Sequence, residues 1–256
     1  MVLAAGGWPG GWTVLWVTAA MVGARTCAMA ANRVVDRWID ARNPRTAGRH
    51  LPRGTLGVNE LRALAAGGAV LMFVAAARLN PLCLTLAPLA LAFLVGYSYT
   101  KRFTWASHWI LGFTDGIAAA GGWIAVRGRF EPPALVLWFA LTVWIAGFDI
   151  IYACQDVEVD RAQRLHSVPA RFGIPAALAV ARVNHALTAV ALAALGWMMG
   201  LGVVYWLGWL VVVGLLIYEH SLVRPGDLSR LDMAFFNVNG YIAVLVLVAV
   251  VGGLWR

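Results

Sequence analysis

Two short stretches concentrate the acidic side chains of a chain that has only 12 aspartates and glutamates among its 256 residues. The groups of interest are Asn32, Asp36 and Asp40 in the first stretch, and Asp149, Tyr152, Asp156 and Asp160 in the second. On a helix, residues four apart lie on one face, and a spacing of three or seven keeps the same stripe. The spacing therefore predicts two helices that each present a line of oxygen atoms.

Two facing lines of carboxylates repel each other unless cations lie between them. Oxygen-only ligands suit Mg²⁺, which typically binds through one or two carboxylates together with phosphate oxygens of a substrate. Arginine offers planar donors that match those phosphate oxygens. Basic residues follow or separate the acidic stretches at Arg45, Arg49, Arg53, Lys101, Arg102 and Arg164. The pattern predicts a Mg²⁺-dependent site for a diphosphate, and the simpler alternative is a set of solvated ion pairs at helix ends.

Arg25 precedes Asn32 by seven residues and so lies on the same predicted face, deeper in an apolar segment. A buried arginine needs an anionic partner. A substrate carboxylate would serve, and so would Asp115 or Asp149. The sequence does not decide between a substrate carboxylate and a protein aspartate as the partner of Arg25.

The elements that position these residues are predicted to be membrane helices, because 61% hydrophobic residues and a mean hydropathy of +0.76 exceed what a soluble globule can bury. We expect an all-α, polytopic bundle. Its eight spans are expected near residues 12–31, 58–77, 82–98, 107–126, 134–153, 174–197, 202–222 and 235–254.

The net charge of +8 comes from loops and not from a nucleic-acid-binding surface. If the loops alternate sides, thirteen basic residues lie on one side, and the other side holds Arg78, Arg127, Arg129 and Arg256. The side with thirteen basic residues also holds both acidic stretches, and it should face the cytoplasm. This predicts a multi-pass protein of a bacterial-type inner membrane, with the lipid bilayer as a partner, no nucleic acid, and an active site on the cytoplasmic side.

Both acidic stretches run on through arginines to a histidine, a proline and a glycine: His50, Pro52 and Gly54 in one, His166, Pro169 and Gly173 in the other. This weak repeat predicts two pseudo-repeated halves that meet around one site. We expect one membrane-embedded domain over residues 1–256.

The stretches Asn32-x3-Asp36-x3-Asp40 and Asp149-x2-Tyr152-x3-Asp156-x3-Asp160 resemble the two signatures of the UbiA superfamily of intramembrane aromatic prenyltransferases, and YSYTKRFT, with Lys101 and Arg102, resembles the phosphate-binding segment between them. The likeness is greatest to 4-hydroxybenzoate polyprenyltransferases and to similar enzymes of the futalosine route to menaquinone. It implies nine helices around a central cavity, with a lateral opening to lipid and a cytoplasmic cap. One family helix would then be missing before Met1.

The resemblance and the residues together imply a magnesium-dependent transfer of a polyprenyl group from its diphosphate to the ring of an aromatic hydroxy acid in quinone biosynthesis. Metal ligands would be Asn32, Asp36, Asp40, Asp156 and Asp160; the diphosphate would be bound by Arg45, Arg49, Lys101, Arg102 and Arg164; Asp149 and Tyr152 would be catalytic, and Arg25 would bind the acceptor. The acceptor could equally be 1,4-dihydroxy-6-naphthoate, on the way to menaquinone.

Two other classes of membrane protein fit the sequence less well. A transporter with intramembrane acids would place them along a path through the bilayer, whereas these acids cluster at one end of their spans. A phosphotransferase acting on a CDP-alcohol would need a different carboxylate signature, which the chain lacks.

Overall fold

The computed structural model describes residues 1–254, and long apolar helices make up most of it. Their bounds are Gly11–Val35 (α2), Val58–Leu79 (α4), Pro81–Thr100 (α5), Ser107–Arg127 (α6), Pro132–Ala153 (α7), Ile174–Met198 (α10), Val203–Leu222 (α11) and Asn239–Gly253 (α12). All are long and apolar enough to cross a membrane, α7 and α12 when taken with the short helices that adjoin them. In the described residues the eight predicted spans are therefore confirmed, and their ends differ from prediction by at most four residues.

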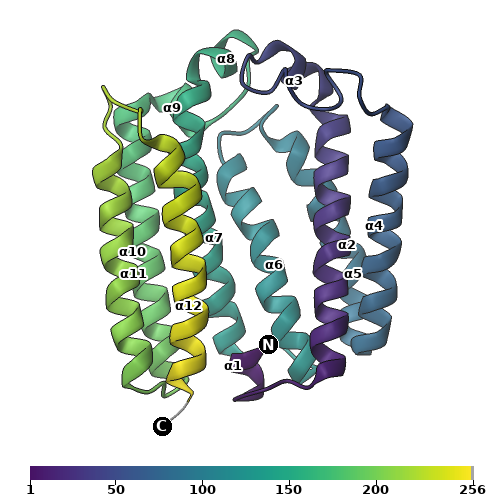
Figure 1. Ribbon diagram of the computed structural model, residues 1–256, viewed down its shortest axis with the longest axis vertical. Coiled ribbons are helices and arrows are strands. Elements are labelled where there is room, and N and C mark those ends of the chain that lie inside the picture. Colours follow the sequence, from purple (N-terminus) through teal and green to yellow (C-terminus); the bar gives the residue numbers. More distant parts are fainter. Residues whose placement is uncertain (255–256) are drawn as a thin grey trace.

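Short helices gather at one end of the bundle, at the top of Figure 1. They are Arg37–Arg42 (α3), the 3₁₀ turn Cys154–Asp156 (η1), Val157–Ala162 (α8) and Val168–Phe172 (α9). Both acidic stretches lie at this end, which we call the motif end. Two further short elements are Val2–Ala5 (α1), near the opposite end, and the π-helix Met233–Val238 (η2), which leads into α12.

The acidic stretches are less regular than the sequence predicted. Asp36 lies between α2 and α3 with φ −91° and ψ 5°, and Asp156, the last residue of η1, precedes α8 in nearly the same conformation. The amide of Asp36 still bonds to Asn32 O at 2.8 Å, and the amide of Asp40 to Asp36 O at 2.8 Å. The expectation of one continuous helix per motif is therefore wrong, although helical spacing survives the break.

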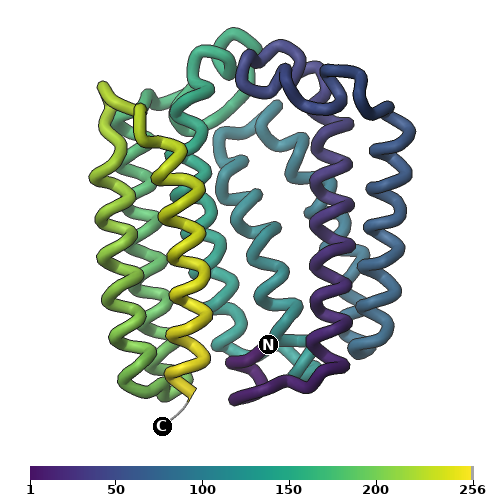
Figure 2. The backbone as a smooth tube through the Cα atoms, viewed as in Figure 1, coloured from purple at the N-terminus to yellow at the C-terminus, as the bar shows by residue number. Residues whose placement is uncertain are grey.

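The helices pack as α2 with α4, α6 with α7, and α7 with α10, followed by α11 and α12 (Figure 2). Small residues make the closest contacts. A Cβ placed on Gly23 of α2 would lie 2.6 Å from Gly68 O of α4, and one placed on Gly112 of α6 would overlap the carbonyl oxygen of Thr142 of α7. Close backbone approach at glycine is the usual basis of helix association in lipid, where the hydrophobic effect does not hold helices together.

Candidate active site

Asp36 is the most heavily bonded acid of the first motif, and only 2% of the residue is exposed. The ammonium of Lys101 lies 2.6 Å from one of its oxygens, and the guanidinium of Arg102 donates to the other at 3.1 Å. The side-chain amide of Asn32 also donates to this carboxylate, at 3.0 Å. The α5–α6 segment therefore supplies both cations that neutralise the motif at the end of α2.

Asp40 is also buried, but its carboxylate has fewer hydrogen-bond partners than that of Asp36. One of its oxygens accepts a hydrogen bond from Arg49 at 2.7 Å. The other, Oδ2, is buried and has no hydrogen-bond partner, and its nearest cation is Arg33 at 4.0 Å. A buried carboxylate oxygen without a donor is costly, so a ligand at this position would be stabilising.

The second motif is tied to the loop that follows the first. Arg45 donates to both oxygens of Asp156, at 2.6 and 3.1 Å, and Asn43 donates to the same carboxylate at 2.9 Å. Arg45 also donates to the Tyr152 hydroxyl at 3.0 Å. Burial alone would lower the pKa of Arg45, but the hydrogen bond and charge of Asp156 raise it, so the guanidinium remains charged. One arginine therefore joins both halves of the site.

The ring of Tyr152 has an aromatic neighbour from a distant part of the chain. Phe235, in the π-helix η2, stacks on it with 4.0 Å between ring centroids and 25° between planes. The sequence analysis did not find Phe235, because no motif marks it. Short π-helical stretches often occur at functional sites, which is the one signal that could have pointed there.

Asp149 and Asp160 each have a polar side chain within hydrogen-bond distance. His108 Nδ1 lies 2.6 Å from an oxygen of Asp149, and the hydroxyl of Ser167 donates to Asp160 at 2.7 Å. His108 is buried at the start of α6, with 4% of the residue exposed and its ring directed at Asp149 of α7.

These groups surround a polar pocket of about 230 Å³ at the motif end. Of the predicted site residues, those that line it are Asn32, Arg45, Lys101, Asp149, Tyr152, Asp156 and Asp160. Asp36 and Asp40 do not line it and are bonded to basic side chains as described above. Arg164 is exposed, has a left-handed backbone (φ 55°) and does not line the pocket, so its diphosphate role stays a prediction.

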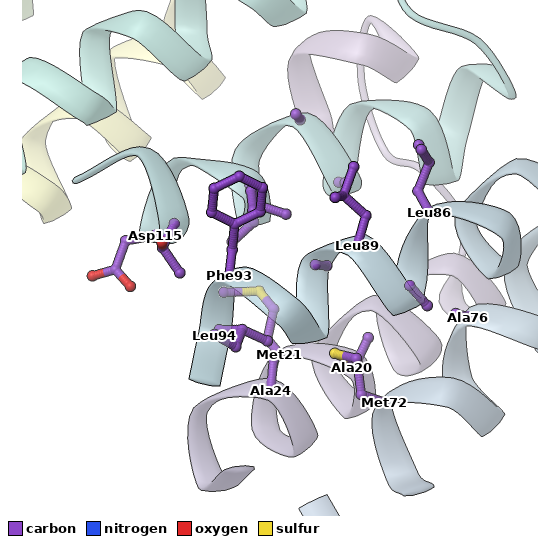
Figure 3. Close-up of a pocket in the computed structure, with 18 of the residues that line it drawn as sticks. Ala20, Met21, Ala24, Met72, Ala76, Leu86, Leu89, Phe93, Leu94 and Asp115 are labelled. Atoms are coloured by element: carbon purple, nitrogen blue, oxygen red, sulfur yellow. The ribbon is translucent and has the colours of Figure 1, made fainter. Parts of the chain in front are cut away.

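An apolar cavity of about 430 Å³ adjoins the polar pocket and shares Tyr97 and Leu111 with it. Its walls come mainly from α2, α4, α5 and α6, and Figure 3 shows Asp115 at one end of the labelled side chains, with Leu86 and Ala76 toward the other. Arg25 also lines this cavity. Within the described residues Arg25 forms no ion pair, so the direct salt bridge to Asp115 or Asp149 that the sequence left open is not formed.

The acids do not form a ready-made metal site. No three histidine, cysteine, aspartate or glutamate side chains among residues 1–254 come together in a way that could hold a metal ion. Basic side chains hold the carboxylates of Asp36, Asp40 and Asp156. The chemistry still fits Mg²⁺, because the predicted ligands all bind through oxygen and Asp40 keeps one oxygen free.

A helical membrane bundle with two acidic motifs, basic partners and an adjoining apolar cavity defines an intramembrane prenyltransferase. The model of the UbiA prenyltransferase family matches residues 1–254, and the chain belongs to this family. The predicted resemblance is therefore confirmed.

Individual relatives agree with this assignment. A 4-hydroxybenzoate octaprenyltransferase of Aeromonas salmonicida is 30% identical over 249 residues, which cover 97% of this chain and 86% of that protein. The apo structure of a UbiA homologue from Aeropyrum pernix superposes with a TM-score of 0.89 at 31% identity, covering 98% of this chain and 92% of that one. A UbiA homologue from Archaeoglobus fulgidus, solved with GPP and Mg²⁺, has a TM-score of 0.71 at 16% identity, covering 94% and 88%.

Proposed function

We propose that this chain transfers a polyprenyl group from a polyprenyl diphosphate to the ring of 4-hydroxybenzoate, in a Mg²⁺-dependent step of ubiquinone biosynthesis. The observation that carries the proposal is the meeting of two acidic motifs with basic side chains around a polar pocket, beside an apolar cavity of about 430 Å³ that would take the isoprenoid tail. The names of the sequence relatives support the acceptor, and the ligands of the Archaeoglobus homologue support a prenyl diphosphate with Mg²⁺.

In this proposal the donor diphosphate lies in the polar pocket. Arg45 and Lys101 line this pocket; Arg45 is bonded to Asp156, and Lys101 and Arg102 are bonded to Asp36. These basic side chains would turn part of their hydrogen bonds toward the diphosphate, with Arg49 and Arg164 as further donors. Bound by Asn32, Asp36, Asp40, Asp156 and Asp160, Mg²⁺ would neutralise the leaving group as a Lewis acid. When a basic side chain turns to the diphosphate, the carboxylate oxygen that it was bonded to would become available to Mg²⁺.

Stabilising the leaving group lets the allylic C–O bond break, so that the first carbon of the prenyl chain becomes electron-poor. The aromatic ring of the acceptor attacks this carbon as the diphosphate leaves, and the ring then loses a proton to the released diphosphate, which restores its aromaticity. Tyr152, fixed by Phe235 and Arg45, presents its ring beside the pocket and would shield the developing positive charge. The apolar side chains of the adjoining cavity exclude water, which would otherwise capture the cation and release a prenyl alcohol.

The acceptor is oriented by two charged groups in this proposal. Arg25 lies in the apolar cavity without an ion-pair partner among the described residues, and it would bind the carboxylate. Asp149 lines the polar pocket and would accept a hydrogen bond from the phenol. We further propose that the motif end faces the cytoplasm of a bacterial-type inner membrane, in line with the charge distribution of the loops.

The test is a transfer assay on purified protein in bilayer nanodiscs, with a polyprenyl diphosphate, Mg²⁺ and one acceptor at a time, read by mass spectrometry. Prenylated 4-hydroxybenzoate that disappears when EDTA replaces Mg²⁺ is the expected product. Parallel reactions with 1,4-dihydroxy-6-naphthoate test the menaquinone alternative. Product from the naphthoate alone would contradict the proposed acceptor, and product from neither would contradict the proposed reaction.

A further inference from the structure

His108 is a buried titratable group for which neither the family motifs nor the proposed reaction has a role. It lies in the first turn of α6, and both of its ring nitrogens have partners. Nδ1 lies 2.6 Å from Asp149 Oδ2, in α7. Nε2 lies 3.2 Å from the backbone nitrogen of Val168, the first residue of α9. The imidazole therefore connects three elements of the motif end.

The partner of Nε2 determines where the ring carries its proton. A backbone N–H can only donate, so the amide of Val168 requires a lone pair on Nε2. The ring is then neutral, with its proton on Nδ1, and that proton points at Asp149. A hydrogen bond to an ionised carboxylate is short and about twice as strong as one between neutral groups, which agrees with the 2.6 Å separation.

The position of Val168 is itself well fixed. Only 1% of the residue is exposed. The amide of the preceding His166 donates to the carbonyl of Lys101 at 2.7 Å, and the Ser167 side chain accepts from the amide of Ala170 at 3.3 Å. Because the loop before α9 is held in this way, the amide of Val168 cannot swing away, and the ring of His108 cannot turn over without losing a buried hydrogen bond.

We propose that His108 is a positioning residue that fixes the carboxylate of Asp149 for the phenol of the acceptor. Its Nδ1–H occupies one carboxylate oxygen, and the rest of the carboxylate faces the polar pocket, where a phenol O–H would donate to it. Because both ring nitrogens are engaged in hydrogen bonds, His108 does not transfer protons during the reaction. This inference rests on the proposed function, because it names the substrate group that Asp149 receives.

Two substitutions separate the two hydrogen bonds of His108. Asparagine places an amide nitrogen near the position of Nδ1, so His108→Asn keeps a donor to Asp149. Glutamine reaches the position of Nε2, so His108→Gln keeps an acceptor for Val168 and loses the bond to Asp149. We expect kcat to stay within about threefold of the original protein in His108→Asn, and to fall about 10- to 100-fold in His108→Gln, the loss expected for a hydrogen bond to a charged group.

Two further readouts separate positioning from folding. The affinity for geranyl diphosphate with Mg²⁺, measured by calorimetry, should be unchanged in both variants, because the acceptor side alone is disturbed. His50→Gln is the matched control, since His50 is an exposed histidine of the motif end that does not line either pocket, and it should behave as the original protein. An equal loss of kcat in the Asn and Gln variants, or no loss in either, would overturn the proposal.

A measurement without turnover keeps this inference distinct from the proposed function. The chain has five histidines, and ¹⁵N NMR of histidine-labelled protein in nanodiscs, assigned by difference with His108→Asn, reports the tautomer of His108. The proposal requires a protonated Nδ1 and a bare Nε2 even if no acceptor is ever prenylated. A protonated Nε2 would refute it, and the expected tautomer together with an inactive protein would place the failure in the proposed reaction.

Discussion

The buried carboxylate of Asp36 is bonded to two cations and a side-chain amide. The charge of Asp36 therefore matters for these contacts as well as its size. The same holds for Asp156, which receives both Arg45 and Asn43. Removing one partner of a buried pair leaves the other charge uncompensated. Substitutions at these residues therefore need variants that preserve size.

Asp36→Asn and Asp156→Asn should each lower Mg²⁺-dependent transfer by at least about 100-fold, because each loses a metal-binding charge worth several kcal/mol in the transition state. Both proteins should still insert into membranes. Transfer assays across a Mg²⁺ titration check this, with Asp227→Asn as control, since Asp227 is exposed in the loop after α11. Near-normal activity in either variant would remove that residue from the metal site.

Arg25→Ala should raise KM for 4-hydroxybenzoate by about 10-fold or more, because it removes a charge-assisted bond to the carboxylate. The KM for phenol, which lacks the carboxylate, should rise much less. Initial rates with both acceptors give the comparison, and Arg62→Ala on the exposed face of α4 is the control. Equal effects on the two acceptors would exclude Arg25 from carboxylate binding.

Residue spacing predicted much of this site, because acids four apart lie on one helix face even where the helix is interrupted. It could not predict which arginine meets which aspartate. Arg45 and Asp156 are separated by 111 positions in the chain, and only the fold brings them together. His108 and Phe235 were missed for the same reason, since each acts through a tertiary contact and neither belongs to a local motif.

At the scale of elements, hydropathy located all eight long helices but not the breaks within them. The 3₁₀ turn at Cys154–Asp156 and the junction at Asp36 leave no mark in a hydropathy pattern. Nor does hydropathy predict which glycines lie at helix contacts. Gly112 and Gly67 both lie inside apolar helices, yet a Cβ at Gly67 would meet nothing within 4 Å, whereas one at Gly112 would overlap the backbone of α7.

Gly112→Ala should therefore destabilise the bundle by about 1–3 kcal/mol, the usual cost of overpacking, because α6 must move away from α7. That shift also moves His108 relative to Asp149, so activity should fall with stability. Gly67→Ala is a matched control that should be neutral or slightly stabilising, since alanine favours helix. Thermal unfolding in detergent compares the two. A Gly112→Ala protein as stable as the original would show that this contact can relax.

The whole molecule carries its loop charge unevenly, and the motif end holds most of the arginines. If this end faces the cytoplasm, then Thr55→Cys should react with an impermeant maleimide only in inverted membrane vesicles. Arg129→Cys, at the opposite end and 67% exposed in its side chain, should react only in intact cells. The original chain is the background control: Cys27 and Cys154 are buried, and any labelling of the half-buried Cys83 is measured there and subtracted. The reverse labelling pattern would contradict the proposed orientation.

The ion pairs of the motif end also have a thermodynamic consequence. A diphosphate that draws Lys101 and Arg102 toward itself uncovers Asp36, and a divalent cation that takes Asp36 frees the same two side chains. Each ligand thus removes the competitor of the other. By linkage, each must raise the affinity for the other by one and the same factor. Donor and metal should therefore bind as a synergistic pair, and the enzyme without donor should hold Mg²⁺ only weakly.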